Sequence, residues 1–340
     1  MPVRRLLRMI AVCAALAFCT SPGLLPALGQ HAQSLRAERT YAYGTHARQR
    51  MAVHWHPERS ADQPRRPGVV VLHGGYWRMD RAPGWREWCR SLSDSGLVVF
   101  DVEYRRNLDA RWPAQRDDVL GALAWIRAHG DRFGVDPDRL VLLGSSAGGH
   151  LATSVGAYGA GARRVAGVAA LSPVADPLRA WRAGAPGPAA DGRTDGGAGT
   201  DGGTGTDGGT AAAHAAHIRA GRQYGVRENA TLLAGCSPAL LPGAGARAAA
   251  CAGVWRDMAA ASHASGADDA PLFLVHSAHD FVPAAHSRGL AHAERARGMP
   301  RASVAVLTVP GGAHGGGLLR EPGVTPALRD WIETRTGSAD

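Results

Sequence analysis

One stretch, residues 140–149, constrains the fold more than any other part of the chain. It reads LVLLGSSAGG, in which an apolar run suited to a β-strand breaks into a turn of glycine and serine. Residues 150–158 favour a helix, so the stretch predicts a strand, a sharp turn and a helix, with Ser146 at the apex. Gly144 and Gly148 would let the strand and the helix pass close to the serine without a Cβ in the way. The alternative is an ordinary loop between a strand and a helix.

Apolar runs and amphipathic stretches alternate along the rest of the chain. The runs are short and continuous, as expected for strands that are buried on both faces of a parallel sheet. The predicted strands are residues 68–72, 97–102, 140–143, 165–171, 271–275 and 303–309, with an edge strand near residues 51–57; the predicted helices are residues 117–129, 150–158, 284–297 and 325–334. This alternation predicts an α/β fold with a mostly parallel central sheet flanked by helices.

Three chemically active side chains follow predicted strands. They are Ser146, Asp280 and His314, and the carboxyl ends of parallel strands share one edge of a sheet, so the three are expected to converge there. Ser146 would be the nucleophile and His314 the general base, while Asp280 would orient the imidazole. His276, His279 and His286 are alternative bases, but none follows the last strand within a glycine loop.

A glycine loop follows the strand at residues 68–72. It begins His73-Gly74-Gly75, and backbone N–H groups in such a loop can face the oxyanion that forms during acyl transfer. The expected oxyanion donors are the amides of Gly74, Gly75 and Ala147. The alternative is a simple glycine turn.

Composition excludes several classes of function. The sequence contains no lysine, so neither a Schiff-base enzyme nor a lysine-dependent phosphate loop can be built. The formal charge of +9 comes from arginines that form no stripe with aromatic residues, so no nucleic-acid partner is expected. No C-x-x-C pair occurs, and His54 and His56 lack a carboxylate at useful spacing, so neither a metal site nor a cofactor is expected.

The N-terminus predicts export. Arg4, Arg5 and Arg8 precede the apolar residues 9–18, and small residues end at Gly29, which together describe a signal peptide at residues 1–29. The apolar run is too short to span a membrane, so a periplasmic or extracellular protein with no stable membrane span is expected. A lipoprotein anchored at Cys19 and a twin-arginine signal are the alternatives. Residues 30–48 would be a lead-in with little structure of its own.

Export would leave three cysteines in the mature chain. They are Cys89, Cys236 and Cys251, so at least one thiol is free. Cys236 and Cys251 flank a Gly/Ala-rich loop and could form a disulfide bond.

Two segments interrupt the α/β pattern. Residues 183–213 contain three TDGG repeats with no large apolar residue to bury, which predicts a disordered, low-complexity insertion. A calcium-binding repeat is the alternative, but the period of six residues lacks the apolar position that such repeats need. Residues 218–262 are expected to form a cap-like region over the site.

Six motifs together resemble the α/β-hydrolase superfamily, in its esterase/lipase branch with the His-Gly-Gly loop. This branch includes carboxylesterases, feruloyl and acetyl esterases and kynurenine formamidases. The motifs are HGGYW (73–77), EYRR and WPAQRDD (103–118), DPDRLVLLGSSAGGHLA (136–152), HSAHDFVP (276–283) and GGAH (311–314). The resemblance implies an α/β-hydrolase catalytic domain at residues 49–340 with a partial cap. Lipase-like members usually carry a third glycine where this chain has Tyr76, so Tyr76 and Trp77 are expected to line a substrate pocket that favours small acyl groups.

The expected function is an exported serine hydrolase that acts on a small-molecule ester. It would cleave carboxylic esters of short acyl or aromatic acids through an acyl-enzyme on Ser146. An arylformamidase that uses the same triad remains open, as does a catalytically silent binding protein with this fold, and a metal-dependent hydrolase is a third alternative. The oligomeric state is left open by the sequence.

Overall fold

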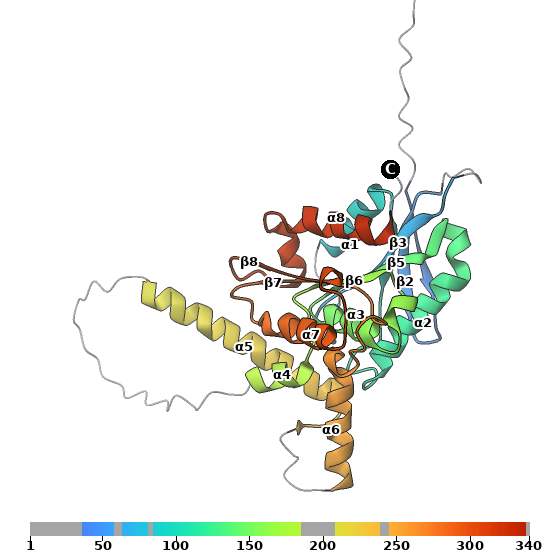
Figure 1. Cartoon of the computed structure of the whole chain (residues 1–340). Helices are drawn as coiled ribbons and strands as arrows, with labels where there is room; N and C mark the ends of the chain where they lie inside the picture. Colours follow the sequence, from blue (N-terminus) through green and yellow to red (C-terminus); the bar gives the residue numbers. More distant parts are fainter. Residues whose placement is uncertain (1–35, 58–62, 81–83, 185–207, 239–244, 338–340) are drawn as a thin grey trace, which may run out of the picture. The chain divides into compact units, whose positions relative to one another are not determined.

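In the part of the chain that the structure describes, eight strands form one sheet with the order β1-β2-β4-β3-β5-β6-β7-β8 (Figure 1). This computed structural model describes residues 36–57, 63–80, 84–184, 208–238 and 245–337. The strands are β1 (Ala37–Ala42), β2 (Arg50–Trp55), β3 (Arg66–Leu72), β4 (Val98–Val102), β5 (Val135–Ser145), β6 (Gly167–Leu171), β7 (Leu272–Ser277) and β8 (Val304–Val309). β1 pairs antiparallel with β2 and β2 pairs antiparallel with β4, while every other pairing is parallel. The predicted α/β fold with a mostly parallel sheet is confirmed.

Helices cover both faces of this sheet. The α-helices are α1 (Trp85–Asp94), α2 (Ala114–His129), α3 (Ala147–Ala157), α4 (Pro177–Ala183), α5 (Gly208–Ala234), α6 (Ala246–Met258), α7 (Ala285–Ala296) and α8 (Val324–Thr336). α1 and α8 pack on one face, against alternate strand residues such as Val69 and Val141. α2, α3 and α7 pack on the other face, against intervening residues such as Val70 and Leu142. The alternation of side chains along each strand thus supplies two separate apolar cores.

The N-terminal part of the sheet differs from the prediction. Residues 30–48 were expected to have little structure, but residues 37–42 form strand β1 at the sheet edge. Strand β2 was expected at the edge, and it lies between β1 and β4 with residues 51–54 buried. β1 reads AERTYA and is largely exposed, so it carries too few apolar residues to give a sequence signal. The sheet therefore begins about a dozen residues before the predicted start of the domain at residue 49.

The predicted low-complexity insertion ends earlier than expected. It was placed at residues 183–213, but helix α5 already begins at Gly208. Residues 185–207, which hold most of the TDGG repeats, lie outside the described part of the chain, as does the predicted signal peptide at residues 1–29. Among the helices that are described, none is long and apolar enough to cross a membrane.

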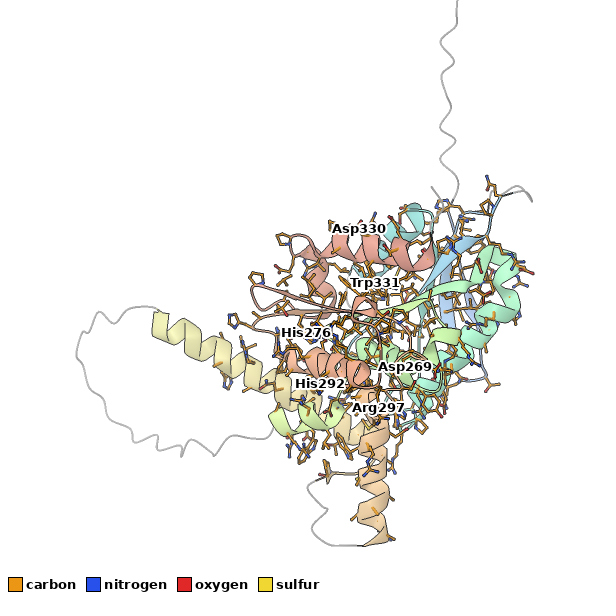
Figure 2. The ribbon with its side chains drawn as sticks, in the orientation of Figure 1. Asp269, His276, His292, Arg297, Asp330 and Trp331 are labelled. Atoms are coloured by element: carbon orange, nitrogen blue, oxygen red, sulfur yellow. A yellow bond between two sulfur atoms is a disulfide. The ribbon has the colours of Figure 1, made fainter. Side chains whose placement is uncertain are left out.

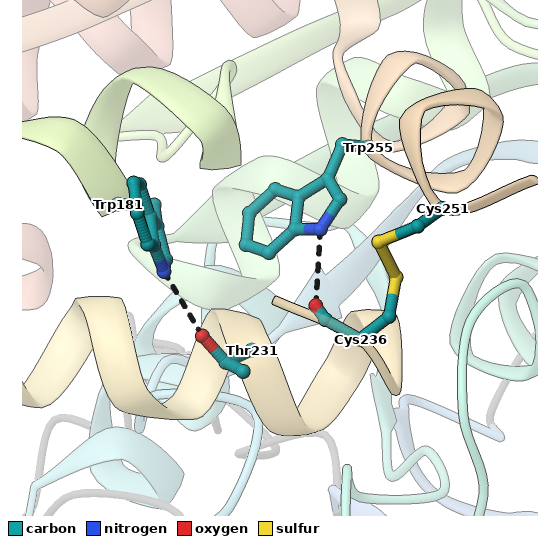
Figure 3. The surroundings of a disulfide bond; sticks show 5 residues. All are labelled: Trp181, Thr231, Cys236, Cys251 and Trp255. Atoms are coloured by element: carbon teal, nitrogen blue, oxygen red, sulfur yellow. Dashed lines mark hydrogen bonds between the residues drawn. A yellow bond between two sulfur atoms is a disulfide. The ribbon is translucent and has the colours of Figure 1, made fainter. Parts of the chain in front are cut away.

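A disulfide bond, which the sequence left as one possibility, joins helix α6 to the residues that follow α5. Cys236 follows the end of α5 and Cys251 lies in α6, with 6.0 Å between their Cα atoms. Figure 3 shows Trp255 beside this bond, where its Nε1 donates to the carbonyl oxygen of Cys236 at 3.1 Å. Trp181 lies on the other side of Trp255, and its Nε1 donates to Thr231 Oγ1 at 3.1 Å. These contacts tie α4, α5 and α6 into one unit. Cys89 is buried and takes no part in this disulfide bond.

Candidate active site

The turn that holds Ser146 is a strained junction between β5 and α3. β5 ends at Ser145 and α3 begins at Ala147, and Ser146 between them has φ 53° and ψ −112°. A Cβ on Gly148 would lie 2.1 Å from the carbonyl oxygen of Leu72, and a Cβ on Gly144 would lie 2.3 Å from the carbonyl oxygen of Gly148. Both glycines are therefore required by close backbone approach, as the G-x-S-x-G spacing predicts.

The structure brings Ser146, His314 and Asp280 together. Ser146 Oγ donates to His314 Nε2 at 2.8 Å, and His314 Nδ1 donates to Asp280 Oδ1 at 2.7 Å. The Asp280 side chain is buried, while 18% of the His314 side chain is exposed. A nucleophile, a base and a buried carboxylate in this order have the geometry of a serine-hydrolase triad.

Asp280 is held in its charged form by several donors. Ser172 Oγ donates to Asp280 Oδ2, and the backbone N–H of Val282 donates to Asp280 Oδ1 at 3.0 Å. His276, near the carboxyl end of β7 in Figure 2, has its Nδ1 at 3.7 Å from Asp280 Oδ2. Burial alone would raise the pKa of Asp280, but the nearby His276 and the hydrogen bonds from His314 and Ser172 outweigh it and lower that pKa well below its ordinary value. The carboxylate is thus able to stabilise an imidazolium.

Ser172 is a site residue that was not assigned from the sequence. It follows strand β6 directly, with a φ of 50°, and its Oγ also accepts the backbone N–H of Gly315 at 2.9 Å. One hydroxyl therefore connects the carboxylate to the loop that carries His314. Its position after a strand, at the same sheet edge as the triad, is the signal that could have identified it.

The glycine loop lies against the nucleophile. A Cβ on Gly74 would lie 3.0 Å from the carbonyl oxygen of Ser145 and 3.2 Å from Ser146 Cβ, and Gly75 has a φ of 116°. Within the described residues, the amides of Gly74, Gly75 and Ala147 donate to no protein group. Three free donors beside a serine Oγ form an arrangement that can stabilise an oxyanion.

His73 supports this loop from behind. Its ring stacks on Tyr104 with 4.8 Å between the ring centroids, and Tyr104 Oη donates to the carbonyl oxygen of His73 at 2.8 Å. His73 Nδ1 lies 2.7 Å from the carbonyl oxygen of Gly74. Both rings are buried, so His73 fixes the loop and is not a competing base.

The prediction that Trp77 lines a substrate pocket is wrong. Its side chain is buried in the core, where Nε1 donates to Nδ1 of His150 at 3.0 Å. His150 Nε2 in turn donates to the carbonyl oxygen of Met258, at the end of α6, at 2.8 Å. Burial lowers the pKa of His150 to about 4, so the ring is neutral and can accept and donate at the same time. Trp77 therefore links the glycine loop to α3 and α6.

Tyr76 does lie beside the triad. Its ring is stacked at 6.3 Å from the ring of Phe281, which lies 4.0 Å from the ring of His314. Tyr76 and Trp77 have φ values of 58° and 55°, and these two successive left-handed residues reverse the chain. Phe281 was not assigned from the sequence, although it directly follows Asp280.

The predicted absence of a metal stays a prediction. Within the described residues, no three His, Cys, Asp or Glu side chains gather in a way that could hold a metal ion. His54 is buried in β2 with Nδ1 at 3.6 Å from Glu38 Oε2, while burial lowers its pKa. His54 and Glu38 therefore form a structural contact between neighbouring strands.

The fold and the Ser146 turn match a known family. A family model described as alpha/beta hydrolase fold matches residues 69–193, which contain both the glycine loop and the Ser146 turn. The chain has the α/β-hydrolase fold. The resemblance that its motifs suggest, to the esterase/lipase branch, is confirmed by its relatives.

Parts of this α/β hydrolase are similar to curated esterases. It is 37% identical over 101 residues to Esterase LipC of Mycobacterium tuberculosis, a match that covers 29% of this chain and 25% of that protein. It is 35% identical over 95 residues to ethyl acetate hydrolase of Pseudomonas putida, which covers 27% of this chain and 30% of that protein. The match thus spans about a quarter of the length of these curated relatives.

Solved esterase structures share the fold over most of the chain. Esterase B from Lactobacillus Rhamnosis superposes with a TM-score of 0.62 and 20% identity, covering 89% of this chain and 85% of that one. The carboxylesterase Cest-2923 from Lactobacillus plantarum superposes with a TM-score of 0.57 and 17% identity, covering 90% of this chain and 99% of that one. At these identities the similarity shows the shared fold of the α/β hydrolase.

Proposed function

We propose that the protein hydrolyses carboxylic esters through an acyl-enzyme on Ser146. The observation that carries this proposal is the continuous chain of hydrogen bonds from Ser146 through His314 to Asp280. The esterases among its relatives support the same reaction.

The first half-reaction transfers the acyl group to the serine. His314 Nε2 takes the proton of Ser146 as Oγ attacks the ester carbonyl carbon, and the carbonyl oxygen becomes an oxyanion facing the amides of Gly74, Gly75 and Ala147. When the intermediate collapses, the carbon–oxygen bond to the alcohol breaks and His314 returns the proton to the departing alkoxide. The products are the alcohol and an acyl-enzyme.

The second half-reaction releases the acid. His314 Nε2 takes a proton from water, whose oxygen attacks the acyl carbon, and the same three amides again face the oxyanion. Collapse breaks the bond to Ser146 Oγ, which recovers its proton from His314. Throughout, the charged Asp280 offsets the positive charge on the imidazole.

The aromatic wall beside the triad supports a preference for short acyl or aromatic acids. Tyr76 and Phe281 limit the space next to His314, and flat rings can stack on them. An arylformamidase would use the same triad on a C–N bond, so turnover of 4-nitrophenyl acetate and of N-formylkynurenine should be compared. A strong preference for the formamide would overturn the ester proposal.

A labelling experiment separates an enzyme from a silent binding protein. A fluorophosphonate probe is expected to label the wild type at Ser146 and to leave the folded Ser146→Ala variant unlabelled. Absence of labelling and of ester hydrolysis in the folded wild type would favour the binding protein.

We also propose that the protein is exported. The disulfide bond between Cys236 and Cys251 supports an oxidising compartment. Expression of the full chain in a bacterial host, followed by mass spectrometry of the exported protein, is expected to find Gln30 at the N-terminus. A lipid-modified Cys19 would support the lipoprotein alternative, and an intact Met1 in the cytoplasm would exclude export.

A further inference from the structure

Helix α5 lies against the loop that carries Asp280. Arg219 Nη2 donates to the carbonyl oxygen of His279 at 2.8 Å, and Gln223 Nε2 donates to the carbonyl oxygen of Phe281 at 3.1 Å. A Cβ on Gly225 would lie 3.5 Å from Tyr76 Cε1. Contacts over two turns of this helix therefore reach both aromatic residues of the wall beside the triad.

Arg222 lies on the same part of α5 and places a positive charge at this wall. Its guanidinium carbon is 5.6 Å from the centre of the Phe281 ring, and that ring is 4.0 Å from the ring of His314. Arg222 is exposed, so its guanidinium can reach a ligand. The Phe281 ring therefore lies between this charge and the imidazole that acts on the substrate.

Arg222 has no ion-pair partner among the described residues. Arg219 likewise forms no ion pair with a described carboxylate. Burial raises the pKa of the Tyr76 phenol, and the positive charge of Arg222 acts on it in the opposite direction. The phenol thus stays protonated and available as a donor beside an unpaired guanidinium.

We propose that Arg222 selects ester substrates that carry a carboxylate near the scissile bond. This inference rests on the proposed esterase function and names the substrate class of the same site. A guanidinium pairs with a carboxylate through two parallel N–H···O bonds, which a neutral ester cannot match. The carboxylate belongs either to the acyl chain or to the alcohol, and both have the same chemistry.

The test uses two substrate pairs in which a carboxylate replaces a methyl group. For the acyl side, monomethyl glutarate is compared with methyl pentanoate, and for the alcohol side, 4-acetoxybenzoate is compared with 4-tolyl acetate. Acid release in a pH-stat gives kcat/KM for each ester, and the ratio of the anionic to the neutral ester is the quantity of interest. The variants are Arg222→Gln, the charge-preserving Arg222→Lys and the control Arg301→Gln. Arg301 is exposed and precedes β8, so it lies at the opposite edge of the sheet from His314.

In one of the two pairs, Arg222→Gln is expected to lower the ratio by about threefold to tenfold, as for one charge pair near a protein surface. Arg222→Lys should recover most of the ratio, and 0.5 M NaCl should reduce it in the wild type. The pair that responds identifies the side of the ester that bears the carboxylate. Ratios in Arg222→Gln that equal those in Arg301→Gln would overturn the inference while leaving the esterase intact. A folded wild type that hydrolyses none of the four esters and is not labelled at Ser146 would overturn both.

Discussion

A buried carboxyl pair far from the triad makes the stability of the fold depend on pH. Glu294 in α7 is 1% exposed and Asp269 is 3% exposed. Asp269 lies in the loop before β7 (Figure 2). Burial and the negative charge of Asp269 raise the pKa of Glu294 to about 8, from an ordinary value of 4.5. Asp269 itself accepts hydrogen bonds from the backbone N–H and the hydroxyl of Ser265 at 2.6 and 2.7 Å.

The sign of the effect follows from proton binding. Between pH 4.5 and about 8, the folded protein holds a proton on Glu294 that the unfolded chain has lost. The free energy of unfolding therefore falls as the pH rises through this window. Each pH unit costs at most about 1.4 kcal/mol, and relaxation of the site reduces the total, so a loss of about 1 to 3 kcal/mol between pH 5 and pH 8 is expected.

The measurement compares the wild type with Glu294→Gln by urea unfolding at pH 5, 6.5 and 8. Glutamine has the shape of the protonated acid and does not titrate, so groups that titrate in both proteins cancel in the difference. The variant is expected to gain about 1 to 3 kcal/mol over the wild type as the pH rises. The exposed Glu333→Gln variant is the matched control and should follow the wild type. Parallel pH profiles for the wild type and Glu294→Gln would refute the reasoning.

Three further changes test other parts of the structure. Replacing both Cys236 and Cys251 by serine should lower the free energy of unfolding by about 3 kcal/mol, because the disulfide bond closes a loop with a sequence separation of 15. Chemical unfolding measures this loss, and a loss below about 0.5 kcal/mol would contradict the prediction. Ser172→Ala removes a donor to Asp280 and an acceptor for Gly315, so kcat for 4-nitrophenyl acetate should fall about tenfold; an unchanged kcat would exclude the positioning role. Gly148→Ala should lower the free energy of unfolding by about 3 kcal/mol or more, or prevent folding, because the new Cβ would meet the Leu72 carbonyl oxygen at 2.1 Å. Gly253→Ala, in α6 with open space around it, is the control and should be neutral or stabilising. Equal thermal stability of the two variants would contradict the close-approach argument.

The catalytic edge was predictable because its signals are local. Ser146, Asp280 and His314 each follow an apolar run, and parallel pairing brings the ends of those runs to one edge whatever lies between them. Asp269 precedes strand β7 and Asp280 follows it, and this difference alone was enough to select Asp280 as the carboxylate of the triad. The positions of the triad residues directly after their strands are therefore what made the triad predictable from the sequence.

The contacts of α5 at the site were not predictable in the same way. α5 places Arg222 and Gln223 at the wall beside His314, but its sequence is rich in Ala and Gly and has little amphipathic period to show which face packs. The prediction that Trp77 lines the substrate pocket was wrong for a related reason. Which of two adjacent aromatic residues faces the site depends on the backbone angles of the turn, and those follow from the tertiary packing around His150.

The buried histidines oppose the buried carboxyl pair in their effect on stability. Burial lowers the pKa of His150 to about 4 and that of His286 to about 3, so the unfolded chain binds protons that the folded protein excludes below pH 6.5. Their contribution is complete above pH 6.5 and is lost as the pH falls toward these values, whereas the contribution of Glu294 is lost as the pH rises toward 8. Below pH 6.5 the stability gained with rising pH from His150 and His286, to which the lowered pKa of His54 adds, outweighs the stability lost through Glu294. Above pH 6.5 the loss through Glu294 dominates. The wild type is therefore expected to be most stable near pH 6.5. Glu294→Gln should still lose stability as the pH falls below 6.5 but should no longer lose it as the pH rises above 6.5. Urea unfolding from pH 4.5 to 8 measures both effects, and a wild-type free energy of unfolding that still rises between pH 6.5 and 8 would contradict this balance of buried groups.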